Sequence, residues 1–209
     1  MSTPVAERAE RATARASAKF EARRAELAAS AILTLAETGY ANTSLRDIAQ
    51  NSDFSHGVLH YYFDDKLDLI IYCVRQYKAA CVLRYDEVLE TSRTADQLKK
   101  GFVRLLGETL VEDASFHRLW YDLRAQSLFE EPLRRDAVDI DGTLDRMVWR
   151  IVTRYAELSG QPVQTSQSVA YATFDGLFQR ALLSHLAGDT RAVQNLRRQA
   201  TEALGLLVA

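Results

Sequence analysis

The chain has 209 residues, of which 47% are hydrophobic, and its formal net charge at pH 7 is −2. This length suffices to bury a substantial core, and the low numbers of glycine and proline, nine and three, favour a helical globular protein. No apolar run approaches the ~20 residues that a membrane-spanning helix needs. Charged residues begin at Glu7, so the sequence predicts neither a membrane span nor a secretory signal, and we expect a cytoplasmic protein.

The N-terminal stretch concentrates basic residues in a chain that is nearly neutral as a whole. Two interpretations of residues 1–17 stay open: a solvated, flexible tail, or a basic arm that reaches DNA phosphates or the minor groove. From about residue 18 to 38 the apolar spacing predicts a helix, which Gly39 ends. The basic residues between positions 8 and 24 are Arg8, Arg11, Arg15, Lys19, Arg23 and Arg24, so this set extends past the tail into the expected helix.

Residues 42–66 predict two very short helices joined by a tight turn. Ser44 is a cap candidate with Asp47 three residues on, and Ser55 is a second cap candidate. Asp64 is expected to cap a third, much longer helix. This is the layout of a helix-turn-helix, which places its second helix in the DNA major groove.

The segment resembles the TetR family of transcriptional regulators. The resemblance rests on the order and spacing of Gly39-Tyr40, Thr43 to Ala49, Ser55 to Phe63, and Lys66-Leu67. It implies an all-α, TetR-like fold with a three-helix DNA-binding domain at residues 18–66. Residues 67–209 would form a C-terminal helical domain for effector binding and dimerisation.

The residues that the resemblance places against DNA surround the second motif helix. Two positions depart from the family: Asp53 in the turn would weaken DNA affinity if exposed, and His60 stands where an aromatic residue is common. Base-edge contacts are expected from Arg46 and the second helix, and phosphate contacts from Tyr62 and Lys66. The full predicted set is Thr43, Ser44, Arg46, Ser55, His56, Gly57, Val58, His60, Tyr61, Tyr62 and Lys66.

Beyond the motif the apolar spacing predicts a succession of further helices. Cys73 and Cys81 fall on the first of them, ~12 Å apart along its axis, too far for a disulfide within that helix. They are either buried small hydrophobes or a redox switch. The expected helices cover about 64–91, 94–111, 114–129, 132–158, 165–187 and 190–207.

The last two expected helices carry apolar stripes broader than one core face needs. In TetR-like proteins the two final long helices pair with those of a second subunit, and a two-fold dimer would supply the ~34 Å spacing between motifs that a palindromic operator requires. An intrachain helical hairpin is the alternative. The predicted dimer interface is Val169, Ala181, Leu182, Leu196, Ala200 and Leu204.

The middle helices are the expected location of a small-molecule site, because they combine aromatic residues with few polar groups. Each of these residues taken singly is also compatible with a packed core. Arg124 in apolar company would favour an anionic effector, although Asp122 could simply pair with it. The predicted pocket is Phe116, Trp120, Tyr121, Arg124, Trp149, Tyr171, Phe174 and Phe178.

No motif of a catalytic site is present in the sequence: there is no Gly-x-Ser-x-Gly, phosphate loop or His-Glu-x-x-His. His56 and His60 have the spacing of metal ligands on a helix but no evident acidic or cysteine partner, so DNA contact is the preferred interpretation. His117 and His185 are expected to be structural or exposed. We therefore predict a protein that is not an enzyme and has no cofactor and no metal.

The sequence thus predicts a homodimeric, ligand-responsive, sequence-specific regulator of transcription, a repressor released from a palindromic double-stranded DNA operator by a small molecule. No membrane partner is expected. The alternative is a helical, homodimeric interaction protein with a relic helix-turn-helix, for which Asp53 and the mild acidity are the evidence.

Overall fold

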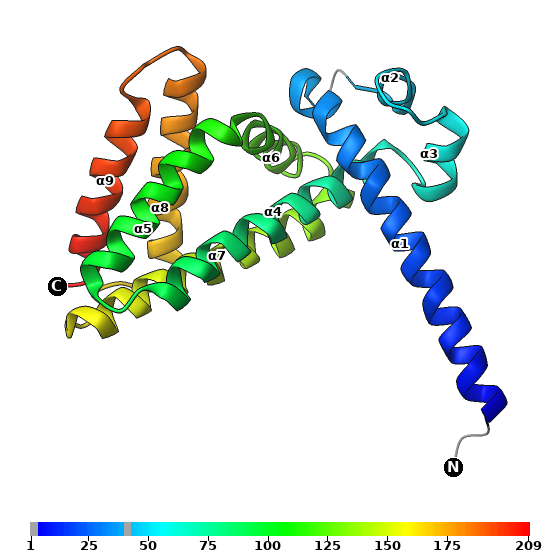
Figure 1. Cartoon of the computed structure of the whole chain (residues 1–209). Helices are drawn as coiled ribbons and strands as arrows, with labels where there is room; N and C mark the ends of the chain where they lie inside the picture. The colour runs from blue at the N-terminus through cyan, green and yellow to red at the C-terminus, as the bar shows by residue number, and fades with distance from the viewer. Residues whose placement is uncertain (1–3, 40–42) are drawn as a thin grey trace. The chain divides into compact units, whose positions relative to one another are not determined.

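The computed structural model describes the backbone of residues 4–39 and 43–209, and the side chains from residue 17 onward except 36, 37 and 40–42. These ranges are α-helical, with one isolated bridge between Val163 and Val208 and no strand, which confirms the predicted all-α class. The helices are α1 (Pro4–Thr38), α2 (Leu45–Gln50), α3 (His56–Tyr62), α4 (Lys66–Thr91), α5 (Ala95–Glu112), α6 (Ala114–Gln126), α7 (Glu131–Ser159), α8 (Gln167–Leu186) and α9 (Ala192–Leu207) (Figure 1).

The chain divides into two compact units, Met1–Gln76 and Tyr77–Ala209. The division falls inside α4, further along that helix than the boundary expected at residue 66. α4 is therefore one continuous helix whose first turns belong to the first unit and whose later turns belong to the second.

In the first unit α1, α2, α3 and the first turns of α4 share an apolar core. Its most deeply buried residues are at most 1% exposed: Leu27, Ala31, Leu35, Ile48, Leu59, Phe63, Leu69 and Ile70. Helices as short as α2 and α3 are unstable alone in water, so this burial is what holds them. Gly39 follows α1 with φ 79°, a left-handed conformation that glycine adopts without a steric penalty.

Two helix starts differ from the sequence-based expectation. α1 begins at Pro4 rather than at about residue 18, so the backbone of the expected tail is helical from residue 4; the side chains of Arg8, Arg11 and Arg15 lie outside the described residues. α4 begins at Lys66, and its cap is Asp65 rather than Asp64, because Asp65 Oδ1 accepts from Asp68 N at 2.8 Å.

In the second unit α5 packs against α7, α8 and α9, and α8 packs against α9 (Figure 1). α6 is shorter than expected and ends at Gln126, and Ser127 to Phe129 form a turn. α9 starts at Ala192, after a turn in which Gly188 has φ 86°. Within the described ranges no helix is long and apolar enough to cross a membrane.

The predicted dimer interface is largely inside this core. Leu182, Leu196, Ala200 and Leu204 are 0–3% exposed, and Ala181 is also buried. Side chains already buried within one chain are unavailable to a second subunit, so these five residues are corrected to core positions. Of the predicted set, only Val169 is exposed, at 54%.

Candidate nucleic-acid interface and effector cavity

The first motif helix, α2, is held by a reciprocal capping box. Ser44 Oγ accepts from Asp47 N at 3.2 Å, and Asp47 Oδ2 accepts from Ser44 N at 2.8 Å. The side-chain hydrogen bond from Ser44 is the main reason that the pKa of Asp47 lies below its usual value. Leu45 and Ile48 point into the core, which leaves Arg46 exposed.

The second motif helix, α3, presents an open face to solvent. Ser55 caps it by accepting from Val58 N, as expected from the sequence. His56, Gly57, His60 and Tyr61 are exposed, and nothing lies within 4 Å of the position that a Gly57 Cβ would occupy. The His56 and His60 rings pack edge to face on this helix, with centroids 4.5 Å apart.

The remaining predicted DNA contacts are placed less uniformly. Ser44 and Ser55 are exposed caps, whereas Val58, Tyr62 and Lys66 are half-buried. The Tyr62 ring lies 4.8 Å from that of Phe20 on α1. Thr43 differs from the rest of the set, because it is 3% exposed and its hydroxyl donates to Gly39 O at 2.7 Å. The structure thus gives Thr43 an internal role.

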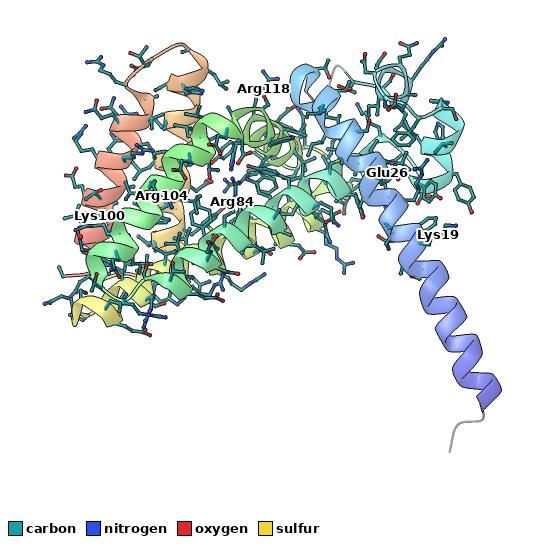
Figure 2. The ribbon with its side chains drawn as sticks, viewed as in Figure 1. Lys19, Glu26, Arg84, Lys100, Arg104 and Arg118 are labelled. Atoms are coloured by element: carbon teal, nitrogen blue, oxygen red, sulfur yellow. The ribbon has the colours of Figure 1, made fainter. Side chains whose placement is uncertain are left out.

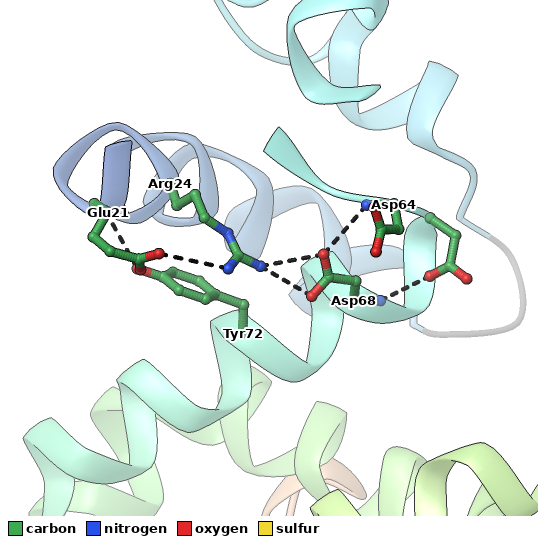
Figure 3. A network of polar contacts seen from close by, with 6 residues as sticks. Glu21, Arg24, Asp64, Asp68 and Tyr72 are labelled. Carbon is green, nitrogen blue, oxygen red and sulfur yellow. Dashed lines mark hydrogen bonds and ion pairs between the residues drawn. The ribbon is translucent and has the colours of Figure 1, made fainter. Parts of the chain in front are cut away.

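A polar network in the first unit ties α1 to the start of α4 (Figure 3). Arg24 donates to Asp68 Oδ1 and Oδ2 at 2.9 and 3.2 Å, and Asp68 Oδ2 also accepts from Asp64 N. The guanidinium lies over the rings of Phe63 and Tyr72, 4.8 and 4.6 Å from their centroids. This network holds the start of α4, where the predicted phosphate contact Lys66 lies; the other predicted phosphate contact, Tyr62, is the last residue of α3.

The second unit contains a cavity of about 60 Å³. Its walls come from α4, α5, α6, α7 and α8, and they are mostly aromatic and aliphatic. The residues lining it are Lys78, Cys81, Tyr85, Phe102, Leu106, His117, Trp120, Tyr121, Leu144, Met147, Val148, Tyr171, Phe174, Asp175 and Phe178.

Five of the eight predicted pocket residues line this cavity: Trp120, Tyr121, Tyr171, Phe174 and Phe178. The other three do not. Phe116 stacks on Tyr77, with ring centroids 4.7 Å apart, and Trp149 packs against the core while remaining half-buried.

Arg124, the third residue outside the lining, pairs with Asp175 rather than with Asp122. Its Nη1 lies 2.5 Å from Asp175 Oδ2, and its Nη2 lies 3.3 Å from Asp141 Oδ2. Tyr121 donates to Asp175 Oδ1 at 2.9 Å, and burial followed by the Asp175 charge raises the pKa of that tyrosine.

The structure adds three polar residues that the sequence-based prediction missed. Lys78 and His117 are 3% and 6% exposed, and Asp175 is half-buried. A signal for Lys78 existed, because it stands in register with Val74, Cys81 and Tyr85 on the apolar stripe of α4. His117, expected to be structural or exposed, is buried beside Lys78 in the cavity wall.

The capped α2, the open face of α3 and the tight turn between them define a helix-turn-helix DNA-binding protein. Residues 22–73 match the family model for bacterial regulatory proteins of the tetR family. The chain is 27% identical over 199 residues to an HTH-type transcriptional regulator BetI of Paraburkholderia phymatum, a match that covers 90% of this chain and 94% of that protein.

Solved structures agree on the fold. A TetR transcription regulator from Haloarcula marismortui superposes with a TM-score of 0.74 at 17% identity, covering 90% of this chain and all of that one. A transcriptional regulator from Saccharomonospora viridis, solved in complex with choline, superposes with a TM-score of 0.73 at 18% identity, covering 90% and 98%. These matches support a TetR-family transcriptional regulator, with the family model itself matching residues 22–73.

Proposed function

We propose that this chain is a ligand-responsive, homodimeric repressor that binds a palindromic operator and is released from it by a small molecule in the cavity of the second unit. The observation that carries this proposal is the continuity of α4. Its first turn, at Lys66, follows the motif directly, and its later residues Lys78, Cys81 and Tyr85 line the cavity. A ligand that displaced the later turns of α4 would act on a helix that begins where the DNA contacts end.

Such coupling needs only a modest difference in affinity between two states. A ligand that binds one state about 100-fold more tightly shifts the equilibrium by about 2.7 kcal/mol, which is within the range of measured coupling free energies. The ligand and the operator would then each weaken the binding of the other, because the coupling is reciprocal.

The dimer surface that we propose is the exposed face of α8. Val169, Leu183 and Leu186 are 54%, 71% and 48% exposed, and Gly176 on the same helix has nothing within 4 Å of the position of a Cβ. A groove of about 520 Å³ runs along α8 beside Arg118 and Leu183. An apolar stripe interrupted by a small residue permits close helix packing between two copies.

The test is to select operator DNA from random duplexes with the purified full-length chain and then to measure binding at moderate salt. The proposal expects a selected sequence with two-fold symmetry, bound by two copies of the chain at least about 1000-fold more tightly than unrelated DNA. Equal binding of all sequences would instead favour an interaction protein with a relic motif. A small molecule that releases the operator would establish the ligand response separately.

A further inference from the structure

The cavity wall contains a buried cation that lacks an acidic partner. Lys78 is 3% exposed, and its Nζ lies 3.0 Å from His117 Nδ1. The ammonium also lies over the rings of Tyr77 and Trp120, 5.5 and 5.6 Å from their centroids. Among the described residues no carboxylate lies within ion-pairing distance of this ammonium.

The bond to His117 leaves most of the donor capacity of Lys78 unused. An ammonium carries three donors and no acceptor, so His117 Nδ1 must accept, and Nε2 carries the ring proton toward Tyr77 OH, 3.0 Å away. Burial and the Lys78 charge hold the pKa of His117 well below its usual value, which agrees with a neutral ring. Two N–H groups of Lys78 therefore have no acceptor among the described residues.

A second donor in the same wall is also unsatisfied. Trp120 Nε1 is buried and has no hydrogen-bond partner in the described chain. An indole nitrogen can only donate. Buried donors without partners are uncommon in folded proteins, and each calls for an explanation such as a bound molecule. The same cavity wall therefore contains hydrogen-bond donors of Trp120 and Lys78 for which the described residues supply no acceptor.

The one acid in the lining is already committed. Asp175 receives Arg124 on Oδ2 and Tyr121 on Oδ1. Its negative charge is therefore compensated by Arg124, and no ion pair joins it to Lys78 among the described residues. A ligand that enters the cavity meets the free donors of Lys78 and Trp120 with aromatic walls around them, and no carboxylate remains to balance a cation.

We infer that the cavity binds a small molecule with a short apolar body and a single carboxylate, which accepts hydrogen bonds from Lys78 Nζ and Trp120 Nε1. This inference rests on the proposed function, since it names the chemical class of the effector. The size follows from the volume: an apolar cavity of about 150 Å³ holds benzene, so about 60 Å³ suits a short aliphatic chain. A quaternary ammonium such as choline would place a second cation against Lys78.

The protonation state of Lys78 also favours an anionic ligand. Burial lowers its pKa to about 8, so the ammonium is mostly protonated at pH 7. A buried charge without an ionic partner is costly, and a ligand carboxylate that supplies the partner recovers part of that cost.

The experiment uses the full-length chain with Trp149→Phe, because Trp149 does not line the cavity and its removal leaves the indole N–H of Trp120 as the only one in the protein. The probes are the sodium carboxylates from acetate to hexanoate, the corresponding primary amides, and choline. Binding is followed by calorimetry and by the ¹H–¹⁵N signal of the Trp120 indole. In the same background, Lys78→Met removes the charge, Trp120→Phe removes the indole donor, and Lys100→Met on the surface of α5 is the matched control (Figure 2).

The expected result is that one or more carboxylates bind and shift the Trp120 indole signal, and that their amides bind about tenfold more weakly. Lys78→Met should abolish this preference, Trp120→Phe should weaken carboxylate binding, and Lys100→Met should change neither. Removing a buried unpaired charge does not threaten the fold, so Lys78→Met tests the ligand contact directly.

Three results would overturn the inference: choline binding more tightly than every carboxylate, carboxylate affinity unchanged in Lys78→Met, or no carboxylate binding by a chain that still binds its operator. If carboxylates bind as expected but leave operator affinity unchanged, the inference stands and the effector part of the proposed function fails. The two failures are therefore distinguishable.

Discussion

Arg24 and Asp68, 44 residues apart in sequence, form an ion pair in which Arg24 Nη2 lies 2.9 and 3.2 Å from the two carboxylate oxygens of Asp68. The pair joins α1 to the first turn of α4, where Asp68 also accepts from Asp64 N. Because the planar guanidinium of Arg24 also stacks on the rings of Phe63 and Tyr72, lysine is a poor substitute at this position.

Arg24→Lys should therefore destabilise the first unit and weaken DNA binding, even though it preserves the charge. The pair is partly exposed, so we expect a loss of about 1 kcal/mol in the free energy of unfolding. Urea denaturation and operator titration check this. Arg154→Lys, at an exposed ion pair with Glu157 on α7, is the control and should be neutral. If the Arg24→Lys variant is as stable as the unchanged chain, the network around Arg24 does not hold α1 and α4 together.

Lys66→Ala should weaken binding to every DNA sequence by a similar factor, because phosphate contacts carry no sequence information. Loss of one phosphate contact should reduce the slope of log affinity against log salt concentration by about 0.9. Binding isotherms on specific and random duplexes at several salt concentrations measure this slope. Lys100→Ala, in the second unit, should leave the slope unchanged. If the slope for Lys66→Ala equals that of the unchanged protein, Lys66 does not contact a phosphate and its role is structural.

Gly57 lies on the exposed face of α3, where a side chain meets no protein atom within 4 Å. Gly57→Ala should therefore stabilise the helix by about 0.5–1 kcal/mol. Gly57→Leu should leave the fold intact and weaken DNA binding by at least about tenfold, because the larger side chain fills the gap between α3 and the groove. Thermal denaturation and operator titration separate the two effects.

The control for Gly57 is Gly205→Leu on α9, another exposed helical glycine with nothing within 4 Å of a Cβ. That change should not alter DNA affinity. Unaltered operator binding by Gly57→Leu would show that this face of α3 does not enter the groove.

Neighbouring leucines on α8 should separate dimerisation from folding. Leu183 is 71% exposed, whereas Leu182 is 3% exposed and belongs to the core. Leu183→Glu should give a folded monomer with weakened operator binding. Leu182→Glu should unfold the second unit, because an unpaired carboxylate in the core costs several kcal/mol. Sedimentation and circular dichroism measure the two outcomes. A dimer that survives Leu183→Glu would place the interface elsewhere.

Lys78 should give the free energy of unfolding a distinctive pH dependence. A lysine in the unfolded chain has a pKa of about 10.4, and burial lowers that of Lys78 to about 8. Between these values the unfolded chain binds more protons, so the Lys78 contribution to stability rises with pH by up to about 1.4 kcal/mol per unit. Below pH 8 both states are protonated, and this contribution is constant.

The comparison that isolates this effect is Lys78→Met, since tyrosine titration is common to both chains. The variant should be the more stable chain at pH 7, and its advantage should shrink between pH 8 and 10 in urea denaturation. The titratable groups that act on Lys78 from around it, Asp113, Asp175, Arg124 and Cys81, are retained in the variant. A pH-independent difference would mean that Lys78 is already neutral in the folded protein.

The parts of this protein that its sequence predicted are those governed by near neighbours along the chain. The Ser44–Asp47 capping box and the Ser55 cap are contacts across three residues, and the structure has both. The turn between α2 and α3 and the helical end at Gly39 are equally local. The DNA-binding surface could therefore be proposed before the fold, with Thr43 as the exception, because its burial depends on contacts with Thr38 and Gly39.

Only the tertiary structure decided which helix packs against each apolar helix face. The apolar spacing of Leu196, Ala200 and Leu204 predicts that this face of α9 is buried. The spacing is the same whether the face packs on α5 and α8 of one chain or on a second subunit. For Lys78 the sequence indicates burial, because the residue lies on an apolar face of α4. The groups that Lys78 contacts, His117 and Trp120, lie on α6 about 40 residues away and could not be predicted. Helical periodicity determines which face is buried, and packing between distant helices determines what that face meets.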